Sequence, residues 1–260
     1  MEISQAVRQQ VLVLSCGGSN PSSPTNIDIL EAQPLGFQKM RKTIFANGEF
    51  YHIYNRGVDK REIFLDGFDY IRFLESMREF NNEIPSGGLY ETYLKNKKIE
   101  SGGSTSLMEV EPPKHPLVEI ICYCLNPNHY HFILKQVFNN GISEFMKRLG
   151  GGYTYYFNKK YDRSGSLFQG RFKAIHIDSN EYLLYLSAYV NKNNFIHQYK
   201  NKGEWKYSSW LDYIGKRNGN LCNQSPIIGQ FKNEKEYQEF VDKTALYLKD
   251  KKEMEKYLLE

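Results

Sequence analysis

The sequence has few cysteines and no long apolar run. Only four of the 260 residues are cysteines, at positions 16, 122, 124 and 222, and their spacing is irregular. This excludes a disulfide scaffold and indicates thiols that stay reduced. The N-terminal run Gln10-Val-Leu-Val-Leu14 is too short for a signal peptide or a membrane span. We therefore expect a cytoplasmic protein without a membrane partner.

The excess of positive charge is also small. A formal net charge of +4 permits a nucleic-acid partner but does not require one. The hydrophobic share of 40% and the charged share of 25% are typical of globular proteins. In contrast, 20 tyrosines and 16 phenylalanines exceed the needs of one core. This excess suggests aromatic surfaces on which bases can stack.

The first 44 residues differ from the rest of the chain. Residues 15–25 are rich in Gly, Ser and Pro and have no apolar period, which predicts a disordered arm. A second interpretation concerns the start codon. The transfer-RNA T-arm sequence GGTTCGAATCC encodes Gly-Ser-Asn-Pro in one frame, as at Gly18 to Pro21. The natural start is then Met40, and both interpretations remain open.

From Phe45 onward, strand and helix patterns alternate. Alternation predicts a strand over 49–56, and a near-continuous apolar run predicts a central strand over 117–125. Two further strands are predicted over 129–136 and 171–177. Helical spacing predicts helices over 69–80, 142–160 and 181–193, with Ser179 as the N-cap of the last one. Gly150-Gly-Gly152 is expected to bend or break the second helix. This order predicts an α+β fold in which helices pack on one antiparallel sheet, with 117–125 and 129–136 paired as a hairpin.

His129-Tyr-His131 is the most informative short motif. Side chains at i and i+2 of a strand share one face, roughly 7 Å apart, so two imidazoles can converge on one metal ion. Tyr130 and Phe132 then pack on the opposite face. A bare His-x-His pair is more often structural, but the preceding Asn126-Pro-Asn128 turn fixes this pair in a rigid place.

Cys122 and Cys124 offer a zinc alternative with the same histidines. Zinc-binding cysteine pairs usually come from knuckles or loops, whereas this pair lies inside the apolar stretch Leu117 to Leu125. We therefore interpret both as small buried hydrophobic residues.

The helix over 181–193 carries a second candidate group. Glu181, Tyr185, Tyr189 and Asn193 recur every fourth residue and share one stripe. Tyr189 and Asn193 can then set a phenol and an amide oxygen beside a metal on the sheet. Packing is the competing role for Tyr189, as for any one of 20 tyrosines.

Basic residues alternate with aromatic ones between Arg163 and Lys173, across a turn that contains Gly165. This arrangement suits a sugar-phosphate backbone with stacked bases. Lys147 and Arg148 add positive charge upstream. Solvated surface charge explains each piece taken singly.

Together these motifs resemble the IS200-like transposases, and among them the REP-associated tyrosine transposases, which are HUH single-strand endonucleases. The resemblance runs in order from about Phe45 to Val241. The matching segments are Tyr51 to Gly57, Leu125 to Phe132, Gly165 to Ala174, Glu181 to Asn193, Trp205 to Tyr213 and Phe231 to Val241. It implies a ferredoxin-like or RRM-like HUH core over 45–215. By composition, 85–116 is an insertion that departs from the family pattern, and 216–260 is expected to be a charged helical tail. The resemblance implies a homodimer as well.

The resemblance also implies residue roles. His129 and His131 match the metal ligands, Tyr189 matches the nucleophile, and Asn193 is the third ligand, followed by Asn194 where the family often has proline. The ion is Mg²⁺ or Mn²⁺. Tyr189 is expected to cut single-stranded or hairpin DNA through a 5′-phosphotyrosine, as in DNA transposition. The side chains expected to contact DNA are Arg56, Lys147, Arg148, Arg163, Gln169, Arg171 and Lys173.

Three alternatives remain. In the first, the chain is a domesticated copy that binds hairpin DNA without moving it. In the second, it is a non-catalytic RNA- or single-strand-binding module with an aromatic sheet. In the third, it is a metal-dependent hydrolase that uses water and keeps its activity when Tyr189 is replaced by Phe.

Overall fold

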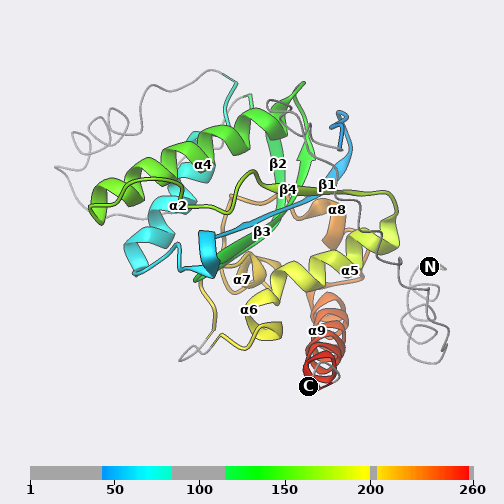
Figure 1. The fold of residues 1–260 in the computed structure, drawn as a ribbon. Coiled ribbons are helices and arrows are strands. Elements are labelled where there is room, and N and C mark those ends of the chain that lie inside the picture. The colour runs from blue at the N-terminus through cyan, green and yellow to red at the C-terminus, as the bar shows by residue number, and fades with distance from the viewer. Residues whose placement is uncertain (1–42, 84–114, 200–203, 258–260) are drawn as a thin grey trace, which may run out of the picture. The chain divides into compact units, whose positions relative to one another are not determined.

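The fold centres on a four-stranded antiparallel sheet with the strand order β2-β3-β1-β4 (Figure 1). The structure is a computed structural model that describes residues 43–83, 115–199 and 204–257. The strands are β1 (Phe50–Arg56), β2 (Val118–Asn126), β3 (His129–Gln136) and β4 (Lys173–Ile177). This order is that of the ferredoxin-like fold, and the predicted α+β class and the hairpin of β2 and β3 are confirmed.

Helices cover both faces of the sheet. On one face, α2 (Gly67–Glu79) and α4 (Gly141–Lys160) pack against each other and against the strands. On the other, α5 (Asn180–Asn191) and α6 (Asn193–Ile196) contact β2 and carry α9 (Glu234–Tyr257). The short helices are η1 (Val58–Lys60), α7 (Trp210–Tyr213) and α8 (Ser225–Ile228).

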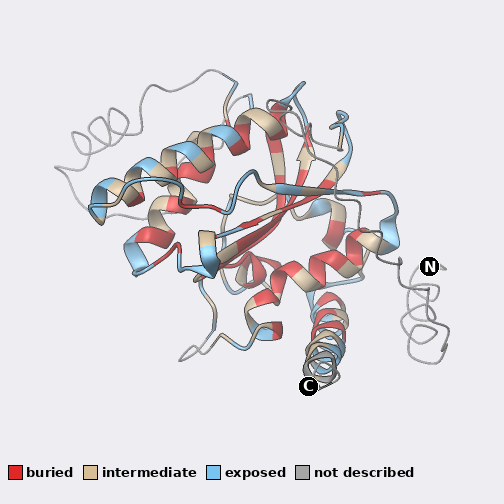
Figure 2. Ribbon diagram, viewed as in Figure 1, coloured by how far each residue is buried: buried red, intermediate tan, exposed pale blue. Residues whose placement is uncertain are grey.

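The core between the sheet and the α2–α4 layer is aromatic. Tyr130 and Phe132 of β3 point into it and pack around Phe73 of α2, at ring-centroid distances of 5.5 and 6.3 Å. Tyr153 of α4 meets Phe73 edge-on at 4.8 Å. All four rings are buried, as the red inner faces in Figure 2 illustrate. The predicted packing of Tyr130 and Phe132 is therefore confirmed, and with it the orientation of β3.

The expected bend at Gly150-Gly-Gly152 is wrong, because α4 is a continuous helix from Gly141 to Lys160. Leu149, Tyr153 and Phe157 are buried on one side of this helix and hold it against the core. A Cβ atom at Gly150 or Gly151 would meet nothing within 4 Å. Tertiary packing thus overrides the low helix propensity of glycine.

The last predicted helix ends earlier than expected. Ser179 caps α5 as predicted, accepting a hydrogen bond from the Tyr182 backbone N–H at 3.3 Å. However, α5 stops at Asn191, and Lys192 with φ −109° separates it from α6. Asn193 therefore opens a new short helix instead of continuing the stripe of α5.

A buried carboxylate anchors the start of α2. Asp69 is fully buried and accepts hydrogen bonds from the Leu65 backbone N–H and the Tyr161 hydroxyl, both at 2.8 Å. The Lys160 ammonium of α4 lies 2.7 Å from its other oxygen. This network ties the capping box of α2, formed with Asp66, to the end of α4.

The C-terminal segment packs closely onto the sheet layer. Tyr237 and Val241 of α9 are buried, and the Tyr237 hydroxyl accepts a hydrogen bond from Asn191 of α5 at 2.9 Å. Residues 45–260 form one compact unit. Segment 1–44 lies almost wholly, and insertion 85–116 mostly, outside the described residues, so these boundaries stay predictions.

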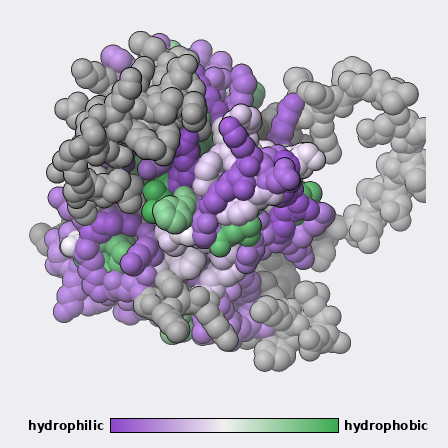
Figure 3. Space-filling view, turned by 90° about the vertical axis from the view of Figure 1, so that its left-hand side faces the viewer, coloured by the Kyte–Doolittle hydropathy of each residue, from purple (hydrophilic) through white to green (hydrophobic). Residues whose placement is uncertain are grey.

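The surface carries little apolar material on the face shown in Figure 3. Its described part is mostly hydrophilic, and the apolar patches on it are small and separate. No helix among the described residues is both long and apolar enough to cross a membrane.

Candidate active site

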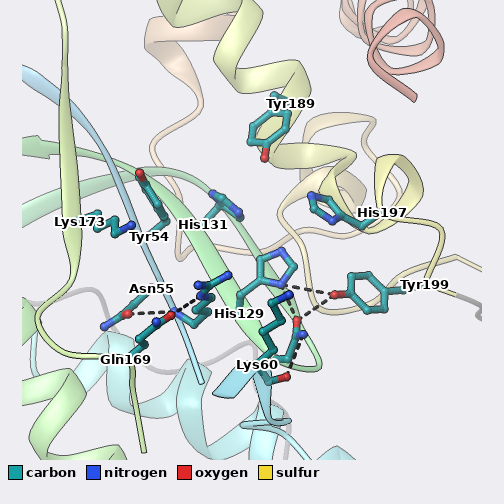
Figure 4. A pocket seen from close by; sticks show the side chains of 12 residues that line it. Tyr54, Asn55, Lys60, His129, His131, Gln169, Lys173, Tyr189, His197 and Tyr199 are labelled. Atoms are coloured by element: carbon teal, nitrogen blue, oxygen red, sulfur yellow. Dashed lines mark hydrogen bonds between the residues drawn. The ribbon is translucent and has the colours of Figure 1, made fainter. Parts of the chain in front are cut away.

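An open pocket of about 510 Å³ lies on the face of the sheet that carries His129 and His131, below α5 and α6 (Figure 4). Its lining comes from four separate parts of the chain. The lining residues are Tyr54, Asn55, Arg56, Lys60, Asn128, His129, His131, Gln169, Lys173, Tyr189, His197 and Tyr199.

The two histidines share this face because β3 alternates, as the i, i+2 spacing predicts. Their ring centroids are 5.2 Å apart. Burial lowers the pKa of His129 to about 4 and holds the pKa of His131 well below its usual value. Both imidazoles are therefore neutral near pH 7, which is the form that binds metal ions.

Asn128 fixes the tautomer of His129. The His129 Nδ1 atom lies 2.6 Å from the Asn128 Oδ1 atom, which can only accept. Nδ1 therefore carries the hydrogen, and Nε2 presents its lone pair. The Tyr199 hydroxyl donates to the same Asn128 oxygen at 2.8 Å and holds it in place. Such an outer hydrogen bond orients a metal-binding histidine.

His52 stands in the same relation to His131. The His52 Nε2 atom lies 2.8 Å from the His131 Nδ1 atom, and the two rings stack at 5.1 Å. Burial lowers the pKa of His52 to about 4, so this ring is also neutral. With His52 as the acceptor, His131 carries its hydrogen on Nδ1 and has a lone pair on Nε2.

Asn193 completes a donor set that fits a divalent ion. Its Oδ1 atom lies 3.1 Å from the His129 Nε2 atom. Neighbouring ligands of a six-coordinate ion with bonds of about 2.1 Å are separated by about 3.0 Å. Within the described residues the Asn193 Nδ2 atom is buried without a hydrogen bond, and no group of three or more His, Cys, Asp or Glu side chains could hold a metal. The candidate set is therefore two imidazoles and one amide oxygen.

Tyr189 reaches the pocket from α5. Its ring meets the His131 ring edge-on at 5.4 Å, and its hydroxyl points toward the histidines (Figure 4). Burial raises the pKa of the Tyr189 phenol, and the nearby Asn193 side chain lowers it in part. The stripe predicted for Tyr189 and Asn193 is thus interrupted at Lys192, yet both residues face the same site.

Residues 109–193 match the family model described as "Transposase IS200 like". This segment is therefore similar to the IS200-like transposases. It covers less than half of the chain and includes His129, His131, Tyr189 and Asn193. A solved structure described as a REP-associated tyrosine transposase bound to a REP hairpin covers 72% of this chain and 90% of its own, with 13% identity and a TM-score of 0.45. No curated protein matches the chain.

Of the basic and polar residues predicted to contact DNA, three line the pocket. These are Arg56, Gln169 and Lys173, and the Arg56 guanidinium donates to the Gln169 side chain. Arg171 is exposed outside the pocket lining.

The other three lie on or next to α4, which packs on the opposite face of the sheet. Arg148 pairs with Glu144 at 2.8 Å, Lys147 approaches the same carboxylate at 3.7 Å, and Arg163 lies over the Phe157 ring. Contact with DNA remains a prediction for all seven.

Several residues of this site were not assigned a role from the sequence. His52 and Tyr54 are two residues apart on β1, like the two histidines of β3, so their side chains lie on the same face of the sheet. This spacing in the segment Tyr51 to Gly57 could have identified them. Lys60 and Tyr199 belong to segments without a recognisable pattern. Only the folded chain brings them to the pocket.

Proposed function

We propose that this chain is an IS200-like transposase, a metal-dependent endonuclease and strand transferase that cuts single-stranded or hairpin DNA with Tyr189. One observation carries the proposal. The Tyr189 hydroxyl points toward the histidines of the pocket (Figure 4), where the His129 Nε2 atom lies 3.1 Å from the Oδ1 atom of the buried Asn193. A phenol beside a ligand set for a divalent ion is the arrangement that nucleophilic attack on a phosphodiester needs.

The reaction exchanges one ester bond for another. The Tyr189 oxygen attacks phosphorus, a tyrosyl O–P bond forms at the 5′ phosphate, and the P–O3′ bond breaks. The phenol loses its proton and the departing 3′ oxygen gains one. Attack by a 3′-hydroxyl of another strand end reverses these steps and rejoins the DNA. No external energy source is needed, since the number of ester bonds is unchanged.

His129, His131 and Asn193 would hold Mg²⁺ or Mn²⁺ in this pocket. The bound ion supplies Lewis acidity, polarising the scissile phosphate and neutralising charge that builds on it. Two neutral imidazoles favour Mn²⁺ over Mg²⁺ somewhat. The phenol itself is protonated near pH 7, because burial raises the pKa of Tyr189. Its activation therefore depends on the positive charge gathered at the site.

The rim of the pocket suits a nucleic-acid backbone. Lys60, Arg56 and Lys173 bring positive charge to its edge. The Lys173 ammonium lies 6.0 Å from the centre of the Tyr54 ring, so charge and an aromatic face are offered side by side. An unpaired base can stack on such a ring while its phosphate contacts the lysine.

Covalent capture tests the proposal. Labelled hairpin oligonucleotides are incubated with the protein and Mn²⁺ and run on a denaturing protein gel. We expect a covalent band that disappears in Tyr189→Phe and in His131→Ala. Tyr155→Phe is the matched control, because Tyr155 is an exposed tyrosine of α4 away from the pocket lining, and it should keep the band.

Two results would contradict the proposal. Cleavage that persists in Tyr189→Phe would indicate a hydrolase that uses water. Binding without any covalent band, across many hairpins and with both metals, would indicate a domesticated or purely DNA-binding protein.

A further inference from the structure

Asn126 places a polar side chain against the proposed ligands. It is the last residue of β2 and is fully buried. Its Nδ2 atom donates to the Asn193 Oδ1 atom at 2.7 Å and contacts the His129 Nε2 atom at 3.0 Å. Because His129 Nε2 presents a lone pair, both hydrogens of the Asn126 amide are used. The Asn126 amide thus provides a hydrogen-bond donor to two of the three proposed ligands, His129 and Asn193.

These three atoms form a nearly regular triangle. Its sides are 2.7, 3.0 and 3.1 Å, between Asn126 Nδ2, His129 Nε2 and Asn193 Oδ1. One face of an octahedral ion with bonds of about 2.1 Å has edges of about 3.0 Å. The inner atom of the Asn126 amide therefore already lies at a ligand position, although it is a nitrogen that donates.

A half-turn of the Asn126 carboxamide would exchange its nitrogen for its oxygen at this ligand position. An NH₂ group cannot ligate a cation, whereas the amide oxygen is a ligand that Mg²⁺ and Mn²⁺ accept. Oxygen and nitrogen of the amide are nearly equal in size, so the turn changes no volume in a closely packed interior. The Asn126 Oδ1 atom now faces the Cys124 thiol at 3.7 Å. After the turn, the NH₂ group meets that sulfur, which is a weak acceptor.

We propose that Asn126 is a fourth protein ligand of the ion, and that its amide turns by half a revolution when the ion binds. This inference rests on the proposed function, because it concerns the same metal site. It accounts for a fully buried asparagine at the end of a strand that is otherwise apolar from Ile120 to Leu125. The competing role is that of a plug, in which the Asn126 amide only fills the empty site and opposes binding.

Calorimetric titration of Mn²⁺ into the DNA-free protein separates these roles. Asn126→Leu keeps the branched shape and removes the oxygen, while Asn126→Asp offers oxygen in either orientation. For a ligand, we expect Asn126→Leu to weaken Mn²⁺ binding roughly 10-fold or more and Asn126→Asp to tighten it. For a plug, both variants bind Mn²⁺ more tightly, and this result would overturn the inference.

Two controls keep the outcomes distinct. Wild-type protein that binds no Mn²⁺, or binds it equally well after His131→Ala, refutes the metal site and with it the proposed function. Wild-type binding that depends on His131 but is unchanged in Asn126→Leu refutes only the fourth ligand. Circular dichroism in EDTA checks that each variant is folded, and Asn126→Ala replaces the leucine variant if that variant does not fold.

Discussion

Replacing His52 by leucine should weaken metal binding although His52 is not a proposed ligand. The His52 Nε2 atom lies 2.8 Å from the His131 Nδ1 atom, and both side chains are buried. Without His52, a hydrogen on His131 Nδ1 loses its acceptor. A buried donor left without a partner costs about 1–3 kcal/mol, so His131 shifts its hydrogen to Nε2, the nitrogen that the ion needs.

The size of the effect follows from this cost. In His52→Leu, the hydrogen of His131 must return from Nε2 to Nδ1 before the ion can bind. This return costs the same free energy as the unpaired buried donor. Since about 1.4 kcal/mol corresponds to a tenfold change in affinity, we expect Mn²⁺ to bind roughly 5- to 150-fold more weakly. His52→Gln should restore most of the affinity, because its amide oxygen can accept near the original position of Nε2.

Calorimetry with Mn²⁺ and DNA-free protein measures this directly. His176→Leu is the matched control, because His176 lies on β4, outside the pocket lining, and its exposed side chain contacts Glu49. Its affinity should equal that of the wild type. Tighter binding by His52→Leu would refute the reasoning, since it would mean that His52 donates to His131 and holds the hydrogen on the wrong nitrogen. Unchanged binding would show that the contact has no influence on the tautomer.

Two further predictions concern stability. Gly150→Ala should stabilise the protein by about 1 kcal/mol, because alanine favours helix over glycine and the site is open. Gly141→Ala in the same helix should lower the melting temperature, since its Cβ atom would lie 2.1 Å from the Leu117 carbonyl oxygen; equal melting temperatures for the two variants would contradict this account of α4. Asp69→Asn should destabilise by about 3 kcal/mol in urea unfolding, because it removes the buried carboxylate of the network and leaves the Lys160 ammonium with the more exposed Asp66 carboxylate. A loss below about 1 kcal/mol, the range of a surface pair, would exclude the structural role given to this network.

Much of the fold could be predicted because its signals are local. Local apolar patterns located all four strands to within two residues at each end, and the period of two placed His129 and His131 on one face. The glycine run misled the prediction for α4 for a physical reason. Propensity is a local term worth about 1 kcal/mol per residue, whereas the burial of Leu149, Tyr153 and Phe157 fixes the helix from outside.

The surroundings of the candidate site could not be predicted, since they depend on contacts between distant segments. His52 contacts His131 because of the register between β1 and β3, in which Tyr54 lies directly opposite His131 and His52 lies two residues before Tyr54. Likewise, Asn126 and Asn193 meet because the chain breaks at Lys192 and α6 returns toward β2. Neither the register nor the break follows from one sequence, because each is decided by packing over the whole sheet.

Each proposed ligand is held by a different polar side chain. Asn128 holds His129, His52 holds His131, and Asn126 holds Asn193. These bonds remove the cost of burying unpaired polar groups without an ion. The protein can therefore keep the site assembled before metal arrives. The same bonds oppose binding, because the ion must replace the two contacts of the Asn126 amide.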